Sequence, residues 1–277
     1  MLFKYLPAER IDVLENLKIR FSPLGSLNDP FEAQPLIDLG EEREQQINTI
    51  SINLEALWER TPDDEKTEEN RALLESEKEK LLVDLHEMTS PFNVGQELVS
   101  RFSDMLGILS LSRTADNLLM WSHYAQEGKG FVIGFDEKHK FFNQSDQTGL
   151  KTNPVPVVYT NKRSHVDPGE KRYYEKLLGE KPRDWAYEEE ERIFRFFPDN
   201  GNSVGFDDFG LAINLISIPK EAIKSVCIGY KVTSEFQKRI LSAISENDIP
   251  SEVLTAKVSE TEYKVEVSSK FSHNKPL

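Results

Sequence analysis

Four consecutive glutamates, Glu188 to Glu191, stand directly before an apolar run that ends at Phe197. In an extended chain alternate residues share a face, so this pattern predicts Glu188, Glu190 and Arg192 on one side of a strand. Two carboxylates beside a guanidinium can carry acid–base or charge-stabilising chemistry, because a nearby cation lowers a carboxylate pKa and keeps the group ionised. A solvated charge run with one ion pair explains the same pattern about as well.

Aromatic side chains are concentrated around a histidine in the segment from Leu119 to Phe131. Trp121, His123 and Tyr124 fall on a predicted short helix that precedes a glycine turn and an apolar strand. His123 is the only histidine with such aromatic neighbours, which favours a cleft in which its pKa is shifted. A structural histidine and aromatic residues that pack on a sheet are the competing interpretation.

A third segment holds polar side chains at the end of a predicted strand. The strand ends at Ser22, and a turn rich in Pro, Gly and Ser leads to Asn28, Asp29 and Pro30. The residue before a proline is pushed out of the helical region, so such a loop holds its side chains rigidly. These residues could instead only cap turns and helices.

We predict that the three segments converge on one cleft, formed by Ser22, Asn28, Asp29, Trp121, His123, Glu188, Glu190 and Arg192.

Several common chemical motifs are absent from the sequence. There is no Walker A motif, no G-x-G-x-x-G after a strand, no H-E-x-x-H and no G-x-S-x-G. One cysteine and five scattered histidines provide no zinc site at the usual ligand spacing. Cys227 lies inside an apolar run, which predicts a buried, inert thiol.

The elements that must position these residues fall into two kinds. Residues 41 to 106 show helical periodicity, with a third helix predicted to end at Gly107, and the stretch from Asp38 to Lys80 holds 14 acidic against 6 basic residues. The flanking segments predict short strands at 2–5, 17–21, 108–111, 131–135, 155–159, 192–197, 211–218, 226–229, 253–258 and 263–267. They also predict helices at 8–14, 117–125, 169–178 and 234–245. We therefore expect a single α+β domain over residues 1–277, with a sheet built from 1–35 and 108–270 and an acidic helical insertion over 41–106.

The composition restricts the class of protein. The formal net charge of −14 disfavours long-range attraction to nucleic acid or anionic lipid. No apolar run approaches the roughly 20 residues that a membrane helix needs, and the N-terminus has no signal-peptide pattern. We expect a soluble, cytoplasmic protein with no membrane partner.

The three segments together resemble a widespread prokaryotic family of uncharacterised proteins. The matching motifs are Phe3-Lys4-Tyr5, Phe21-Ser22-Pro23, Asn28-Asp29-Pro30-Phe31-Glu32, Leu109-Ser110-Leu111-Ser112, Met120-Trp121-Ser122-His123-Tyr124-Ala125 and the run from Trp185 to Arg192. Two positions depart from the family pattern. Gly128 stands where a histidine is common, and Glu191 stands where an aromatic residue is common.

A looser resemblance, to the ADP-ribosyltransferase fold, implies a function. It implies a split, mostly antiparallel sheet that clamps NAD, with Lys4 and Tyr5 on the first strand, Ser22 ending the second, and Glu188-x-Glu190 as the paired glutamates of a late strand. Catalytic roles then fall to Glu190, Glu188 and His123. The residues implied to bind NAD are Lys4, Tyr5, Ser22, Asn28, Asp29, Trp121, Tyr124 and Arg192. The resemblance implies an unknown protein or nucleic-acid acceptor and suits a toxin or phage-defence effector.

Two other classes of function remain open from the sequence. A Mg²⁺-dependent nuclease or phosphohydrolase could gather Asp29, Glu32, Glu188 and Glu190 around the ion, since hard oxygen ligands suit magnesium. A non-catalytic binding module could use the acidic helical insertion to recognise a partner.

Overall fold

The computed structural model describes residues 1–32, 34–103, 105–144, 153–167, 169, 173–197, 203–208 and 210–269. The chain forms two compact units, each built from separate stretches of sequence. We call residues 1–32, 102–161 and 179–277 the sheet unit, and residues 33–101 and 162–178 the helical unit.

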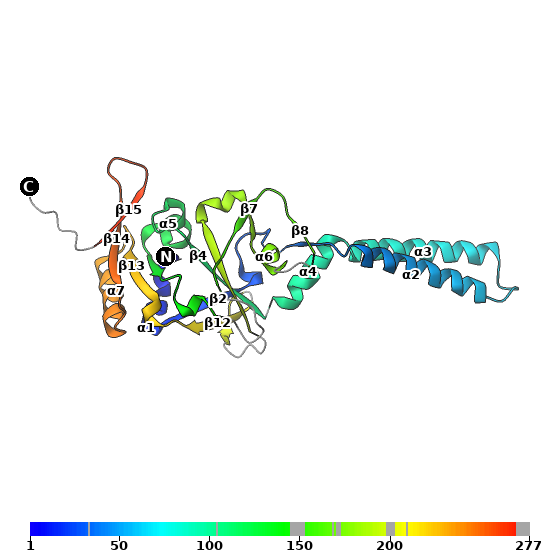
Figure 1. Cartoon of the computed structure of the whole chain (residues 1–277), viewed down its shortest axis with the longest axis horizontal. Coiled ribbons are helices and arrows are strands. Elements are labelled where there is room, and N and C mark those ends of the chain that lie inside the picture. The colour runs from blue at the N-terminus through cyan, green and yellow to red at the C-terminus, as the bar shows by residue number, and fades with distance from the viewer. Residues whose placement is uncertain are drawn as a thin grey trace, which may run out of the picture. The chain divides into compact units, whose positions relative to one another are not determined.

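The sheet unit is an α+β structure built on a large, mixed and mostly antiparallel sheet (Figure 1). Its strands are β1 (Leu2–Leu6), β2 (Lys18–Pro23), β4 (Leu106–Ser112), β5 (Phe131–Phe135), β6 (Val155–Pro156), β10 (Glu190–Phe196), β11 (Ser203–Phe206), β12 (Ala212–Ser217), β13 (Ile223–Ile228), β14 (Glu252–Val258) and β15 (Val265–Ser269). Hydrogen-bonded neighbours run in the order β11-β12-β2-β4-β1-β5-β13-β14-β15, and β10 joins β4 to β6. β13 and β14 are parallel and therefore need a crossover connection, which α7 (Ser234–Glu246) provides.

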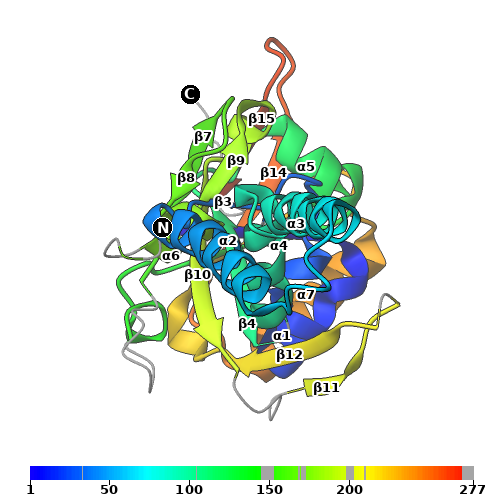
Figure 2. The ribbon, with the colours of Figure 1, turned by 90° about the vertical axis from the view of Figure 1, so that its right-hand side faces the viewer.

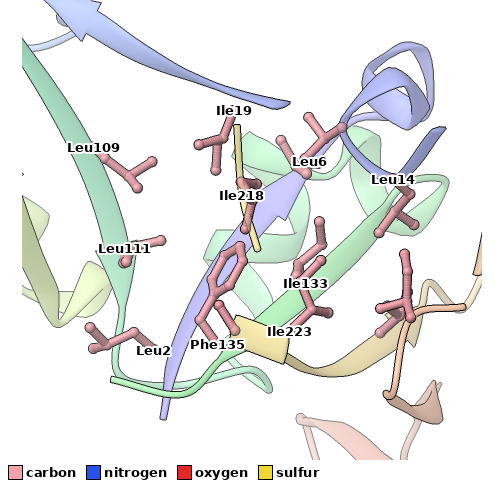
Figure 3. Packing of buried hydrophobic residues seen from close by; sticks show 14 of the residues in the cluster. Leu2, Leu6, Leu14, Ile19, Leu109, Leu111, Ile133, Phe135, Ile218 and Ile223 are labelled. Carbon is pink, nitrogen blue, oxygen red and sulfur yellow. The ribbon is translucent and has the colours of Figure 1, made fainter. Parts of the chain in front are cut away.

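Alternating side chains along the strands build apolar cores on both faces of this sheet. Leu2 of β1 and Ile133 of β5 belong to the larger core, shown in Figure 3. Tyr5 and Val132, which point to the other face, belong to a second core. Burial on both faces explains why β5 is a continuous apolar run rather than an alternating one.

Short helices cover the two faces. α1 (Asp12–Asn16) and α7 (Ser234–Glu246) contact one another and contribute to the larger core, while α5 (Leu118–Tyr124) contributes to the second. The Asn117 side chain accepts hydrogen bonds from the first backbone N–H groups of α5, and Thr233 does the same for α7. These caps fix where each helix begins. Single 3₁₀ turns are η1 (Ala8–Ile11), η2 (Leu24–Ser26), η3 (Gln126–Gly128), η4 (Lys140–Phe142), η5 (Arg183–Glu188) and η6 (Lys220–Ala222).

The sheet opens along one edge of β4. On one side β4 pairs with β10 over its whole length, from Glu190↔Ser112 to Phe196↔Leu106. On the other side it pairs with β2 only at Gly107 and Ile108, and with β1 only at Ser112. The middle of β4 therefore faces a gap between β1 and β2. Polar side chains from these strands fill part of that gap.

The helical unit is dominated by two long antiparallel helices, α2 (Glu41–Arg60) and α3 (Glu68–Met88), which lie side by side in Figure 2. The Thr67 hydroxyl accepts a hydrogen bond from Asn70 N and so caps α3. The unit also contains α4 (Pro91–Phe102), α6 (Tyr173–Leu178) and a short parallel pair, β3 (Leu36–Ile37) with β8 (His165–Val166).

The predicted third helix of the insertion ends earlier than expected. α4 ends at Phe102, and Gly107 lies inside β4 rather than capping a helix. A Cβ atom added at Gly107 would lie 2.6 Å from Phe197 Cε2 and 2.8 Å from Phe21 Cβ. The glycine is therefore required because two aromatic side chains pack against the strand, and not because a helix ends there.

Most predicted strands agree with the structure to within a few residues. Four short strands were missed: β3, β8, β9 (Glu180–Pro182) and β11. β9 pairs in parallel with β7 (Val158–Thr160), the second half of a stretch that we predicted as one strand from 155 to 159. Within the described part of the chain, no helix has the length and apolar composition needed to cross a membrane.

Gly107→Ala tests the packing around β4. The added methyl group must displace the Phe197 ring and the Phe21 Cβ atom, so we expect the free energy of unfolding to fall by about 1–3 kcal/mol, the range for overpacked sites. Gly25→Ala is the control, because the closest atom to its Cβ would be the movable Leu211 Cδ1 at 3.3 Å. Urea denaturation measures both, and equal midpoints for the two variants would contradict this account.

Candidate functional site

A pocket of about 230 Å³ lies in the sheet unit, where β1, β2 and β4 separate. We call it the polar pocket. Its walls combine two ammonium groups, three carboxylates, several hydroxyl groups and three aromatic rings. The lining residues are Phe3, Lys4, Tyr5, Ser22, Ser26, Leu27, Asn28, Glu32, Ser110, Leu111, Ser112, Met120, Tyr124, Lys181, Glu188 and Glu190.

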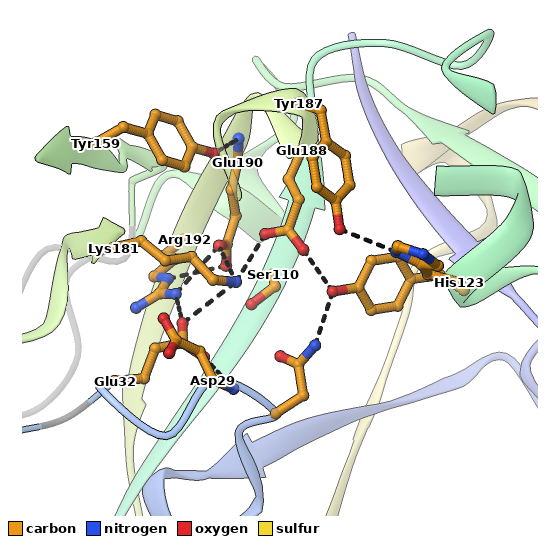
Figure 4. A network of polar contacts seen from close by, with 12 residues as sticks. Asp29, Glu32, Ser110, His123, Tyr159, Lys181, Tyr187, Glu188, Glu190 and Arg192 are labelled. Atoms are coloured by element: carbon orange, nitrogen blue, oxygen red, sulfur yellow. Dashed lines mark hydrogen bonds and ion pairs between the residues drawn. The ribbon is translucent and has the colours of Figure 1, made fainter. Parts of the chain in front are cut away.

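Lys181, on β9, is the central cation of the pocket wall (Figure 4). Its Nζ lies 2.7 Å from Glu188 Oε2, 3.2 Å from Glu190 Oε2 and 3.4 Å from Glu32 Oε1. All four side chains are almost completely buried. Burial lowers the pKa of Lys181, but Glu190 and Glu188 together raise it by more, so the amine stays charged.

Arg192 is the second buried cation and binds two of the same carboxylates, Glu32 and Glu190. Its Nε lies 2.8 Å from Glu190 Oε1, its guanidinium also pairs with Glu32, and Asp29 acts on it electrostatically. β10 is held by β4 on one side and β6 on the other, which fixes the guanidinium in place. Burial lowers the pKa of Arg192 to about 10, so it remains a cation at neutral pH.

The buried cluster holds more carboxylates than cations. Glu32, Glu188 and Glu190 form ion pairs with Lys181 or Arg192, and Asp29 acts on Arg192 electrostatically. Asp29 Oδ1 accepts a hydrogen bond from Phe31 N at 2.9 Å, while its buried Oδ2 has no hydrogen-bond partner among the described residues. Burial raises the pKa of Glu190, and Lys181 only partly opposes this rise. Our expectation that Arg192 would hold that pKa low was therefore wrong in direction, because burial outweighs the neighbouring cations.

Glu188 connects the ion-pair cluster to the aromatic side of the pocket. Its Oε1 accepts a hydrogen bond from Tyr124 Oη, and Asn28 Nδ2 donates to that same hydroxyl at 2.9 Å. Burial and the adjacent carboxylate raise the pKa of Tyr124, so its phenol remains protonated. Tyr124 and Asn28 thus both line the pocket and share one hydrogen-bond chain. Asn28 was predicted to lie in the cleft, whereas Tyr124 was named only as a residue that the resemblance implies binds NAD.

Lys4 and Tyr5 extend from β1 toward β4. Lys4 Nζ donates to the Ser110 carbonyl oxygen at 2.9 Å, a backbone group in the part of β4 that neither β1 nor β2 pairs with. Tyr5 Oη donates to Thr114 O at 3.0 Å. Burial lowers the pKa of Lys4 to about 8, which leaves a substantial fraction of neutral amine near physiological pH.

His123 and Trp121 do not line the pocket. His123 is exposed, and its Nδ1 lies 2.9 Å from Tyr187 Oη. Trp121 is fully buried against Tyr5 and Tyr230, with its indole N–H donating to Ala115 O at 2.9 Å. The indole belongs to the second apolar core, so the structure offers it no ligand contact.

The paired glutamates converge for a different reason than the sequence suggested. We predicted an extended chain from Glu188, but Glu188 ends the 3₁₀ turn η5 and Glu189 adopts a left-handed conformation with φ of 43°. β10 begins only at Glu190. The turn directs Glu188 toward Lys181 and leaves Glu189 exposed.

Sequence reasoning missed Lys181, and it named Glu32 only as a magnesium ligand. Lys181 lies on a three-residue strand without a clear alternation, so no periodic signal marks it. Tyr159, opposite Lys181 in the β7–β9 pair, was also missed; its hydroxyl accepts a hydrogen bond from Glu190 N at 2.8 Å. Ser22 lines the pocket as predicted.

Comparison with known proteins gives one finding. Residues 120–193 match the model of a family described as "Protein of unknown function (DUF2971)". The matched region spans both the Met120–Ala125 motif and the run from Trp185 to Arg192, so this part of the family resemblance is confirmed. No curated protein and no solved structure matches the chain. The α5 region and the paired glutamates therefore lie within the family's matched segment, while Lys4, Ser22 and Asp29 lie outside it.

Lys181→Met tests whether the cluster depends on its central cation. Three buried carboxylates would lose a partner, so we expect a loss of about 3–5 kcal/mol in unfolding free energy at pH 7. The loss should shrink at pH 5, because protonated carboxyl groups need no cation. Lys129→Met, at an exposed ion pair with Glu127 (3.5 Å), should change little. A similar small change for both variants would show that the cluster is not stabilised in this way.

The lowered pKa of Lys4 can be measured directly. NMR of ¹³C-methylated lysines should show one amine titrating near 8, and Lys4→Arg should remove that resonance. Because Glu190 raises this pKa, Glu190→Gln should move the titration still lower. In urea the resonance should return toward about 10.4, the value for an unperturbed lysine. A resonance that titrates at that value in the folded protein would contradict the burial argument.

Proposed function

We propose that this protein is an ADP-ribosyltransferase-like enzyme that cleaves the bond between nicotinamide and ribose in NAD. The observation that carries the proposal is the convergence of Glu188 and Glu190 on a pocket whose other walls include Lys4 of β1 and Ser22 of β2. This is the order of elements that the resemblance implies. A gap in the sheet beside β4 accommodates the pocket.

The chemistry of the pocket suits cleavage of this glycosidic bond. When the bond breaks, its electron pair passes to the pyridinium nitrogen of nicotinamide, and positive charge develops on the ribose. Glu188 and Glu190 supply negative charge on one wall, where it would stabilise that transition state. The acceptor then attacks the ribose carbon and gives up a proton, for which a carboxylate or the partly neutral Lys4 is available.

The size of the pocket limits what it can enclose. Its volume of about 230 Å³ is below the roughly 300–1,000 Å³ of sites that bury a whole drug-sized ligand. We propose that it holds the nicotinamide and its ribose, with Phe3, Tyr5 and Tyr124 offering flat rings to the nicotinamide. The rest of NAD and the acceptor, a protein or nucleic acid, would lie outside it.

The magnesium alternative has less support from the same residues. Glu188, Glu190 and Glu32 already direct oxygens at Lys181 or Arg192. A divalent ion would have to replace Lys181 and Arg192 as the partner of these carboxylates. The displaced cations would remain next to the ion and repel it. Among the described residues, no group of three or more His, Cys, Asp or Glu side chains is arranged to hold a metal ion.

Charge-removing variants test the proposal. Glu188→Gln and Glu190→Gln keep the shape of each side chain, and each should reduce nicotinamide release from NAD by about 100-fold or more, the scale for losing one electrostatic stabiliser. Glu189→Gln is the matched control and should retain activity, because Glu189 is exposed. Calorimetry with NAD should show that binding persists in all three variants.

Two results would contradict the proposal. One is NAD turnover by the wild type that Glu188→Gln and Glu190→Gln leave unchanged. The other is a wild-type protein that neither binds NAD nor releases nicotinamide with protein or nucleic-acid acceptors present. In the second case a thermal shift on adding Mg²⁺ would favour the magnesium alternative.

A further inference from the structure

The α2–α3 hairpin lacks a core of its own. None of the residues in these two long helices is fully buried, although the whole hairpin, from Glu41 to Met88, is described. Its inner faces meet through partly buried side chains, among them Leu54 and Trp58 on α2 and Leu82 and Leu85 on α3. Helices in proteins are usually stabilised by packing an apolar face, so two helices with so little burial leave apolar surface available.

That surface forms rows with a seven-residue repeat. Leu74, Leu81 and Met88 recur every seven residues on α3, and Leu81 and Met88 are 45% and 71% exposed. Ile50 and Leu57 are seven residues apart on α2, and Leu57 is 58% exposed. A seven-residue apolar repeat is the pattern by which helices pack in coiled coils.

The two rows lie on the same side of the hairpin. On each helix, the row is rotated about the helix axis in the same sense from the residues that face the other helix. In a pair of antiparallel helices, rows that are rotated in the same sense lie on the same side of the pair. The other side carries ion pairs, since Arg71 pairs with Glu55 at 2.9 Å and with Glu75 at 2.8 Å. Ile52 and Val83 are also exposed, but neither belongs to a seven-residue apolar row. The hairpin therefore has one side with ion pairs and isolated apolar side chains, and one side with repeating apolar rows.

The charge of the hairpin selects among possible partners. From Glu41 to Met88 there are 15 acidic and 6 basic residues, a net charge of −9. Glu77 and Asp84 follow Leu74 and Leu81 by three residues, so carboxylates alternate with the apolar row on α3. Glu77 also forms an exposed ion pair with Lys80 at 2.6 Å, which a partner's cation would replace. A second copy of the chain would bring another −9 against this surface, and the like charges would repel.

We propose that this side of the hairpin binds a basic amphipathic helix of a partner protein. The apolar row would take leucine-like anchors at seven-residue spacing, and Glu77 and Asp84 would pair with lysine or arginine beside them. None of the residues that line the polar pocket belongs to the hairpin, so this interaction does not depend on the proposed NAD chemistry.

The test uses the full chain and a synthetic helical peptide of about three heptads, with leucine anchors and flanking lysines. Fluorescence anisotropy should show saturable binding to the wild type that weakens with added salt. Leu81→Gln with Met88→Gln should weaken it by about tenfold or more, since such anchors dominate interfaces. Ile52→Gln with Val83→Gln is the matched control: both side chains are exposed, at 66% and 64%, but lie off the rows.

A charge swap sharpens the test. Glu77→Lys with Asp84→Lys should reverse the preference, so that a peptide with flanking glutamates binds better than the lysine peptide. Circular dichroism should show that each variant keeps the helical content of the wild type. A scrambled lysine peptide that binds as tightly as the ordered one would overturn the proposal. So would a wild-type dimer, seen by sedimentation, that Leu81→Gln with Met88→Gln converts to a monomer, because a second copy would then occupy the surface.

Discussion

The pocket depends on one ammonium group, that of Lys181, which lies among the buried carboxylates of Glu32, Glu188 and Glu190. These groups come from segments about 150 residues apart in the chain, and their burial is costly without a partner. Removing such charges from water costs as much as their attraction returns, so apolar residues would stabilise the fold equally well. Their presence beside a pocket is therefore better explained by chemistry than by stability.

The buried cluster holds four carboxylates around two ion-paired cations, Lys181 and Arg192. Burial is the main cause of the raised pKa of Glu190, and the neighbouring Glu188 carboxylate adds to it. Glu188 differs from Glu190 in its hydrogen-bond partners, because it also accepts a hydrogen bond from Tyr124. The two paired glutamates thus stand in different environments, an arrangement by which proteins separate acid and base roles. Lys4 adds a third titratable group, placed by the gap in the sheet beside β4.

Periodicity predicted most strands and helices because each has a face that must be buried. The same reasoning could not find Lys181, since a three-residue strand has no period to detect. The periodicity argument also placed Glu188 on a strand, because a run of four glutamates does not indicate the turn at Glu189, whose φ is 43°. Trp121 was assigned to ligand binding because aromatic residues occur both in apolar cores and in binding sites. Only its contacts with Tyr5 and Tyr230 show that it belongs to the core.

The chain leaves the sheet unit for the helical unit directly after a residue of the buried ion-pair cluster. Glu32 is the last residue of the first stretch of the sheet unit, and it pairs with both Lys181 and Arg192. The loop that carries Asn28 and Asp29 is thus fixed at one end by β2 and at the other by these ion pairs. Because these ion pairs lie within the sheet unit, the loop beside the pocket is fixed by contacts inside that unit.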